Sequence, residues 1–143
     1  MVIRRSNPQD LARISDIWLQ ASLFADEGLP AGFWWHRQES VRKQLEDGSE
    51  LWVADENEQV VGFVAMKSDE LLELYVDPSY QNKELAEALL HLVKRHYPVV
   101  RHRTYAEHPD EIAFYERHGF RIKESQIHPV WRVEELIMEC CDP

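Results

Sequence analysis

The sequence predicts an α/β domain: a mixed, mostly antiparallel sheet of about seven strands flanked by four helices. Three observations lead to this prediction. Short apolar runs bounded by turn residues recur along the chain, as strands require. Apolar residues at helical spacing recur in other segments. A helical segment in the middle of the chain separates two strand-like segments. Such a crossover joins parallel strands, so the fourth and fifth strands are expected to be parallel.

The first half of the chain is predicted to form one strand, two helices and three strands. Asn7 is a predicted N-cap with Pro8 at the first helical position, and apolar residues at helical spacing continue to about Phe24. Gly28 and Pro30 break this helix. The predicted segments are 2–5, 51–54, 60–66 and 71–76 for the strands and about 7–24 and 32–45 for the helices.

The second half is predicted to alternate helices with strands and to end in two strands. The segment 85–96 carries its apolar residues on one helical face, and Pro98 ends it. Pro109 opens another helix after His108, and Gly119 closes that helix in the usual C-terminal manner. The predicted strands of this half are 99–105, 120–127 and 131–140.

Length, charge and cysteine content limit the classes of function. The 143 residues predict one domain, spanning 1–143, and the net charge of −10 argues against nucleic-acid or anionic-membrane partners. An acidic surface suits a cationic or amine-bearing substrate, although acidity also serves solubility. The chain shows no apolar run of membrane-spanning length and no signal peptide. The adjacent Cys140 and Cys141 predict neither a disulfide framework nor a metal site, and a reducing, cytoplasmic setting is expected.

Two local patterns lie on either side of the predicted strand 99–105. The first, LYVDPSYQNKELAEALL at 74–90, combines a strand, a loop and a helix. The second, AFYERHGF at 113–120, is a helix with a Phe-Tyr pair and a closing Gly-Phe. In this order, and with the order of predicted elements, the patterns resemble the Gcn5-related N-acetyltransferases (GNAT) over essentially the whole chain.

The resemblance implies that the chain binds acetyl-coenzyme A. Free N–H groups at a helix N-terminus suit a pyrophosphate, and the loop 81–86 leads into such a helix. In the family, the fourth strand splays from the fifth and its backbone pairs with the pantetheine arm. The cofactor-binding residues that the resemblance implies are Leu74, Tyr75, Val76, Gln81, Asn82, Lys83, Glu84, Leu85, Ala86 and His108.

The loop departs from the family pattern in ways that bear on cofactor affinity. Glu84 stands where the family has its first glycine, and Asn82 replaces a second glycine of close relatives. A carboxylate beside the pyrophosphate is repelled by it, and Lys83 offsets part of that repulsion. His108 stands where many relatives have an asparagine. Weakened cofactor binding is expected, and a catalytically weakened module that binds an acyl-coenzyme A or a protein partner is the alternative function.

The leading function implied is acetyl transfer to a primary amine by direct attack, without a metal. Tyr115 matches the tyrosine that often protonates the leaving thiolate in the family. Glu70 and Glu73 are candidate bases on the central strand, with Glu73 nearer the cofactor. Strand alternation places them on opposite faces unless a bulge intervenes, so at most one is expected to reach the site. A water chain is the alternative base.

Aromatic residues are candidates for the acceptor site. Trp34 and Trp35 lie on the segment that lines this site in the family, where they can bracket an ammonium group or simply pack on the sheet. The acceptor is expected to be a small amine, a protein lysine or a protein N-terminus, and the protein a monomer or homodimer. Several histidines are expected at the surface or at helix ends: His91, His96, His102, His118 and His128.

Overall fold

The computed structural model describes residues 1–24, 38, 42–43, 45, 49–80, 83–130 and 132–141. The described elements confirm the predicted order, except that the predicted second helix lies mostly outside the described residues. The strands are β1 (Val2–Arg5), β2 (Glu50–Glu56), β3 (Gln59–Lys67), β4 (Glu70–Val76), β5 (Val99–Tyr105), β6 (Phe120–Ile127) and β7 (Glu134–Cys141). The helices are a short 3-10 turn (Pro8–Asp10) followed by α1 (Leu11–Phe24), α3 (Lys83–His96) and α4 (Pro109–Arg117).

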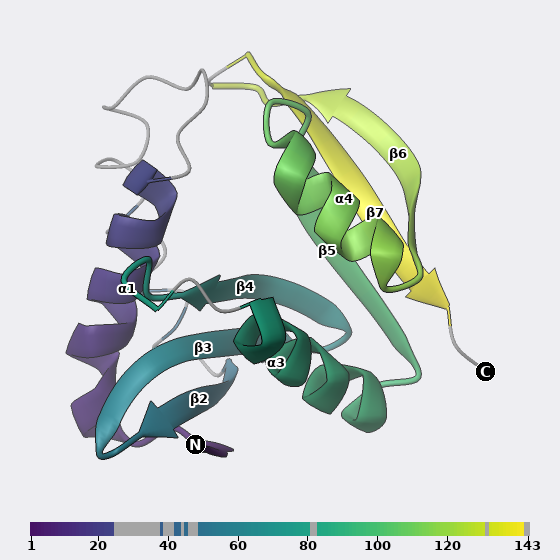
Figure 1. The fold of residues 1–143 in the computed structure, drawn as a ribbon. Helices are drawn as coiled ribbons and strands as arrows, with labels where there is room; N and C mark the ends of the chain where they lie inside the picture. Colours follow the sequence, from purple (N-terminus) through teal and green to yellow (C-terminus); the bar gives the residue numbers. More distant parts are fainter. Residues whose placement is uncertain are drawn as a thin grey trace.

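All seven strands join one mixed sheet in the order β1-β2-β3-β4-β5-β7-β6. Neighbouring strands are antiparallel except β4 and β5, which are parallel as predicted. The helix α3 supplies the crossover between them. In Figure 1, β1 to β4 form one half of the sheet and β5, β7 and β6 the other, and β4 and β5 diverge between the halves.

Helices cover both faces of the sheet and bury one apolar cluster on each. On one face α3 and α4 pack with side chains such as Leu89 and Tyr115, and on the other α1 packs with Ile14 and Trp18. Gly62 of β3 allows α3 to lie close, since a Cβ there would stand 3.2 Å from a Leu85 methyl group and 3.2 Å from the Tyr75 carbonyl oxygen. The close contact holds the N-terminal turn of α3 against β3 and β4.

Local sequence explains the ends of these elements. The β2–β3 hairpin turns at Asn57 and Glu58, whose φ angles of 54° and 66° suit a two-residue turn of the kind that matches strand twist. Before α1, the Asn7 N–H donates to the Asp10 carboxylate at 2.9 Å. Gly119, with φ of 91°, lies in the short turn between α4 and β6. Within the described part of the chain, no helix has the length and apolar character that crossing a membrane requires.

Candidate functional site

The parallel pair β4 and β5 stays together for only two residues. Glu70 pairs with Arg101 and Leu71 with His102, and no later β4–β5 pair occurs among the described residues. The rest of β4 is paired with β3 alone, up to Val76 opposite Gly62. The β4–β5 pairing among the described residues thus ends at Leu71, and 72–76 diverge from β5. The expected splay is present, and its vertex lies at Leu71 and His102.

A β-bulge in β4 determines which side chains face the opening. Ala65 of β3 pairs with Glu73 while the next residue, Met66, pairs with Leu71, so Leu72 is the extra residue. Leu72 and Tyr75 both pack toward the α1 face. Side chains two residues apart in a strand lie on the same face. Glu70, two residues before Leu72, and Glu73, two residues before Tyr75, therefore lie on the α1 face as well. The expectation that at most one of the two glutamates reaches the site is wrong, because the bulge resets the alternation between them.

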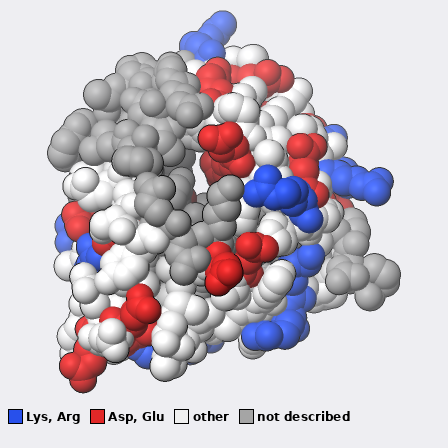
Figure 2. Space-filling model, viewed as in Figure 1, with Lys and Arg blue, Asp and Glu red and all other residues white. Residues whose placement is uncertain are grey.

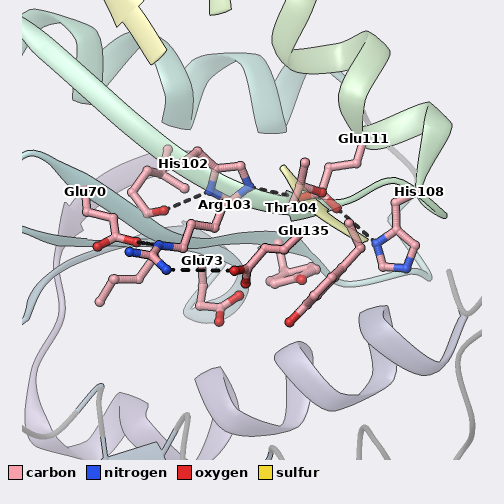
Figure 3. A pocket seen from close by; sticks show the side chains of 12 residues that line it. Glu70, Glu73, His102, Arg103, Thr104, His108, Glu111 and Glu135 are labelled. Carbon is pink, nitrogen blue, oxygen red and sulfur yellow. Dashed lines mark hydrogen bonds and ion pairs between the residues drawn. The ribbon is translucent and has the colours of Figure 1, made fainter. Parts of the chain in front are cut away.

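A cavity of about 120 Å³ lies at the vertex of the splay. Its walls come from β4, from β5, from the start of α4 and from β7 (Figure 3). The lining residues are Glu70, Leu71, Leu72, Glu73, Tyr75, His102, Arg103, Thr104, Tyr105, His108, Glu111 and Glu135. Because β5 side chains alternate, Arg103 and Tyr105 approach from one face of the sheet and His102 and Thr104 from the other. The cavity therefore lies in the opening between the strands and meets both faces.

Carboxylates dominate the lining. Arg103 of β5 lies between two of them: its Nε is 3.2 Å from Glu70 and its Nη1 is 3.8 Å from Glu135. Glu73 is only 6% exposed. In Figure 2, acidic side chains are visible near the centre of the view, with several Lys and Arg side chains to their right. The lining has four glutamates against Arg103, His102 and His108, so carboxylates outnumber the basic side chains, and this excess favours a cationic guest.

His102 and Glu111 form a hydrogen-bonded pair at the vertex. His102 is 4% exposed, which corrects the expectation that it lies at the surface or at a helix end. Burial opposes its charge, but the hydrogen bond and charge of Glu111 outweigh burial, and the pKa of His102 is raised. Burial also acts to raise the pKa of Glu111, yet hydrogen bonds from His102 and His108 lower that pKa from 4.5 to about 2. Glu111 is thus held as a carboxylate.

Tyr115 lies on α4 behind this pair and outside the cavity lining. Its ring is 4.4 Å from the His102 ring and 5.1 Å from that of Phe120, centroid to centroid. Burial raises the pKa of Tyr115 well above 10, and the charges of Glu111, Tyr75 and Glu73 add to the rise. The phenol therefore keeps its proton at neutral pH and is a weaker acid than an exposed phenol.

The other predicted site residues are only partly described. Leu74 and Val76 pack toward the α3 face, and His108 lines the cavity with its Nδ1 3.4 Å from Glu111. At the start of α3, Glu84 is exposed, Leu85 is buried and Ala86 is half-buried, while Lys83 is described for its backbone only. Four predicted positions lie outside the described residues: Gln81, Asn82, Trp34 and Trp35.

Sequence reasoning missed four residues of the site: His102, Arg103, Glu111 and Glu135. One signal was available for His102. It stands between Val100 and Thr104 in β5, so alternation puts it on the inward face with them. The partners of Arg103 come from β4 and β7, and no local pattern connects these strands.

Comparison with known proteins gives the family. The model of the acetyltransferase (GNAT) domain family matches residues 47–122, which include β3, β4, α3, β5 and α4. The chain belongs to the GNAT family. It is therefore an enzyme of the N-acetyltransferase class, whose reaction is acetyl transfer and whose members use acetyl-coenzyme A as the acyl donor.

Individual relatives are more distant. The peptidyl-lysine N-acetyltransferase YiaC of Escherichia coli K12 is 26% identical over 122 residues, which is 85% of this chain and 84% of YiaC. The solution structure of apo YjaB from Escherichia coli superposes with a TM-score of 0.85 at 20% identity, covering both chains fully. A streptothricin acetyltransferase from Bacillus anthracis, solved with acetyl coenzyme A, gives a TM-score of 0.60 at 16% identity over 66% of this chain and 63% of that one. These structures support the fold assignment.

Proposed function

We propose that this protein transfers the acetyl group of acetyl-coenzyme A to the primary amine of a lysine side chain, by direct attack in a ternary complex. The observation that carries the proposal is the acidic cavity at the vertex of the β4–β5 splay. An opening between parallel strands gives a cofactor arm a place to lie along a strand edge. Carboxylates at its vertex attract an alkylammonium group. The name of the relative YiaC, a peptidyl-lysine acetyltransferase, supports the same acceptor.

The cofactor is proposed to lie along the open edge of β4. The backbone of Leu74, Tyr75 and Val76 would pair with the pantetheine arm, because this part of β4 lies beyond the point where β4 and β5 part. The pyrophosphate would lie at the N-terminus of α3, near Gln81, Asn82, Lys83 and Glu84, with Leu85 and Ala86 in the first turn. The N-terminal N–H groups and the helix dipole favour an anion there.

The residues around the cavity can supply the proton transfers. Glu73 is proposed to take a proton from the lysine ammonium, directly or through water, which leaves a neutral amine. The amine nitrogen then bonds to the thioester carbon. The tetrahedral intermediate collapses as the C–S bond breaks, the nitrogen releases its second proton to solvent, and a solvent proton later restores the Tyr115 phenol. Tyr115, neutral at physiological pH, is proposed to give its proton to the departing thiolate. The products are an amide and coenzyme A with a free thiol.

The arginine in the cavity bears on acceptor choice. Arg103 is about half exposed and joins Glu70 to Glu135 across the cavity. A lysine ammonium entering from solvent can replace it beside Glu70, whereas an acceptor with a carboxylate next to its amine meets a negative balance. Cationic peptides are therefore the proposed substrates, ahead of free amino acids.

Two measurements test this proposal. Acetyl-coenzyme A at 100 times its dissociation constant should stabilise the folded protein by about 2.7 kcal/mol, a shift of several degrees in Tm. A blocked peptide with one lysine flanked by arginines should then be acetylated, as mass spectrometry will show. The same peptide with flanking glutamates should react at least about tenfold more slowly. Equal rates for the two peptides contradict the role of the acidic cavity, and an absent Tm shift at millimolar ligand contradicts the cofactor.

A further inference from the structure

His102 occupies the vertex at which β4 and β5 part. It is the last β5 residue paired with β4, opposite Leu71. Its ring Nδ1 is 2.8 Å from the Leu71 carbonyl oxygen, and its Nε2 is 3.0 Å from the Glu111 carboxylate on α4 (Figure 3). One buried ring therefore connects three elements: the opened strand, the strand that leaves it and the helix above.

The hydrogen-bond partners define the protonation state of this ring. A carbonyl oxygen and an ionised carboxylate can only accept, so both ring nitrogens must carry a proton for both bonds to form. A neutral imidazole has one N–H and must give up one bond. The charged and titratable groups around the ring are Glu73 on β4, Glu111 and Tyr115 on α4, and His108, which immediately precedes α4. With two carboxylates among them, the buried imidazolium is compensated.

The same ring also fixes the position of Tyr115. Glu111 and Tyr115 are four residues apart on α4, so their side chains lie on one face of the helix. That face is held to β5 by the His102–Glu111 bond, and the Tyr115 ring lies against the His102 ring at a centroid distance of 4.4 Å. Phe120 supports the tyrosine from another side, at 5.1 Å. A change at His102 therefore moves the tyrosine relative to the open edge of β4.

We propose that His102 is a positioning residue for acetyl transfer, which sets the place of Tyr115 relative to the thioester by clamping α4 to the Leu71 carbonyl at the vertex of the splay. The inference rests on the proposed function, because it assigns the effect of His102 to the proton donor of that reaction. It assigns His102 no contact with the substrate. The clamp joins β4 to α4 only when both bonds are present, so His102 and Glu111 act as one unit.

A double-mutant cycle with Tyr115 tests the inference. His102→Gln keeps a polar side chain of similar length but cannot donate in two opposed directions. With acetyl-coenzyme A and the arginine-flanked lysine peptide at saturation, it should lower kcat by about tenfold or more, as small misplacements of a catalytic group do. In the Tyr115→Phe background the same substitution should change kcat by less than about twofold, because the group that His102 positions is already absent. The dissociation constant for acetyl-coenzyme A should stay within about threefold in each variant.

Matched variants control for general damage to the fold. Arg101 precedes His102 on β5, and its Nη2 is 2.8 Å from the carboxylate of Asp69, the residue before β4. Arg101 therefore also connects β5 to the start of β4. Unlike His102, it is half exposed and does not line the cavity. Arg101→Gln should leave kcat unchanged. Should His102→Gln not fold, Glu111→Ala removes the acceptor of the same bond at a partly exposed side chain and carries the same cycle. Circular dichroism identifies the folded variants.

Each result supports or contradicts the inference. An equal loss of kcat in both tyrosine backgrounds means that His102 acts independently of Tyr115, and the inference is then wrong. A full kcat in folded His102→Gln, or a loss confined to the dissociation constant of the cofactor, also overturns it. In these cases the wild type still acetylates the peptide, and the proposed function stands. A wild type that binds acetyl-coenzyme A but acetylates no amine overturns the proposed function and the inference together.

Discussion

Replacement of Glu111 by glutamine should remove a pH-dependent part of the stability. In the folded protein the pKa of Glu111 is lowered from 4.5 to about 2 by its bonds to His102 and His108, against the opposing effect of burial. A carboxyl group whose pKa is lower in the folded state stabilises the fold fully above its unfolded pKa. That contribution is lost as the pH falls from about 4.5 toward 2.

The size of the effect follows from the shift. At 1.36 kcal/mol for each pH unit, a shift of about 2.5 units corresponds to an upper value of about 3 kcal/mol near neutral pH. Glu111→Gln keeps the size of the side chain but cannot ionise. The wild type should therefore exceed the variant in unfolding free energy by up to about 3 kcal/mol at pH 6, and the difference should shrink steadily between pH 4.5 and pH 3.

Urea unfolding followed by tryptophan fluorescence measures this difference at each pH. Glu116→Gln, at an exposed glutamate on the same helix, is the control and should follow the wild type at every pH. A wild-type advantage over Glu111→Gln that does not change between pH 6 and pH 3 would refute the reasoning. On the alkaline side, His102 has a raised pKa, so its contribution is full below 6.5 and is lost as the pH rises through the folded value.

Further substitutions test the cofactor loop, the base and the packing of α3. Glu84→Gly removes an exposed carboxylate from the first turn of α3. Acetyl-coenzyme A should then bind about five- to tenfold more tightly, with a larger gain at low salt. Equal or weaker binding in calorimetry would mean that Glu84 points away from the phosphates. Glu73→Gln should lower kcat by roughly a hundredfold in the peptide assay, with cofactor affinity kept, whereas an unchanged kcat indicates that water alone removes the proton. Gly62→Ala places a Cβ 3.2 Å from the Tyr75 carbonyl oxygen and should cost about 1–3 kcal/mol in urea unfolding, and an unaltered midpoint would show that α3 can shift without loss.

The element order was predictable because it depends on local patterns. Apolar spacing within single segments predicted α3 and β5, and glycine and proline marked where α4 begins and ends. The strands 99–105 and 120–127 match the structure to the residue. The parallel pairing of β4 and β5 followed from one crossover rule. These features need no knowledge of partners far away in the sequence.

The geometry of the site depends on such partners, which explains why much of it was missed. The bulge at Leu72 exists only in the register between β3 and β4, and no residue type at that position signals it. Glu70 and Glu73 were therefore assigned to opposite faces. His102 was expected at the surface or at a helix end, yet its two bonds are to Leu71 and Glu111, 31 residues before and 9 after it. A buried ion pair is recognisable only when both partners are placed.

Family resemblance supplied what physical patterns could not. The loop and helix of 74–90 and the helix of 113–120 gave the family before the structure, and the family model confirms it over 47–122. The roles of Tyr115 and of the cofactor loop came from the same source and stay proposals. The acidic cavity and the His102–Glu111 pair, in contrast, are features of this chain that the two motifs did not indicate.

Initial rates over a matrix of acetyl-coenzyme A and lysine-peptide concentrations test the central claim most directly. Free thiol and acetylated peptide are measured in the same samples. Direct attack in a ternary complex predicts one thiol released for each acetyl-lysine formed, and double-reciprocal lines that intersect. Thiol release without acetylated peptide would contradict transfer to an amine, and parallel lines would contradict direct attack by pointing to an acetylated enzyme intermediate.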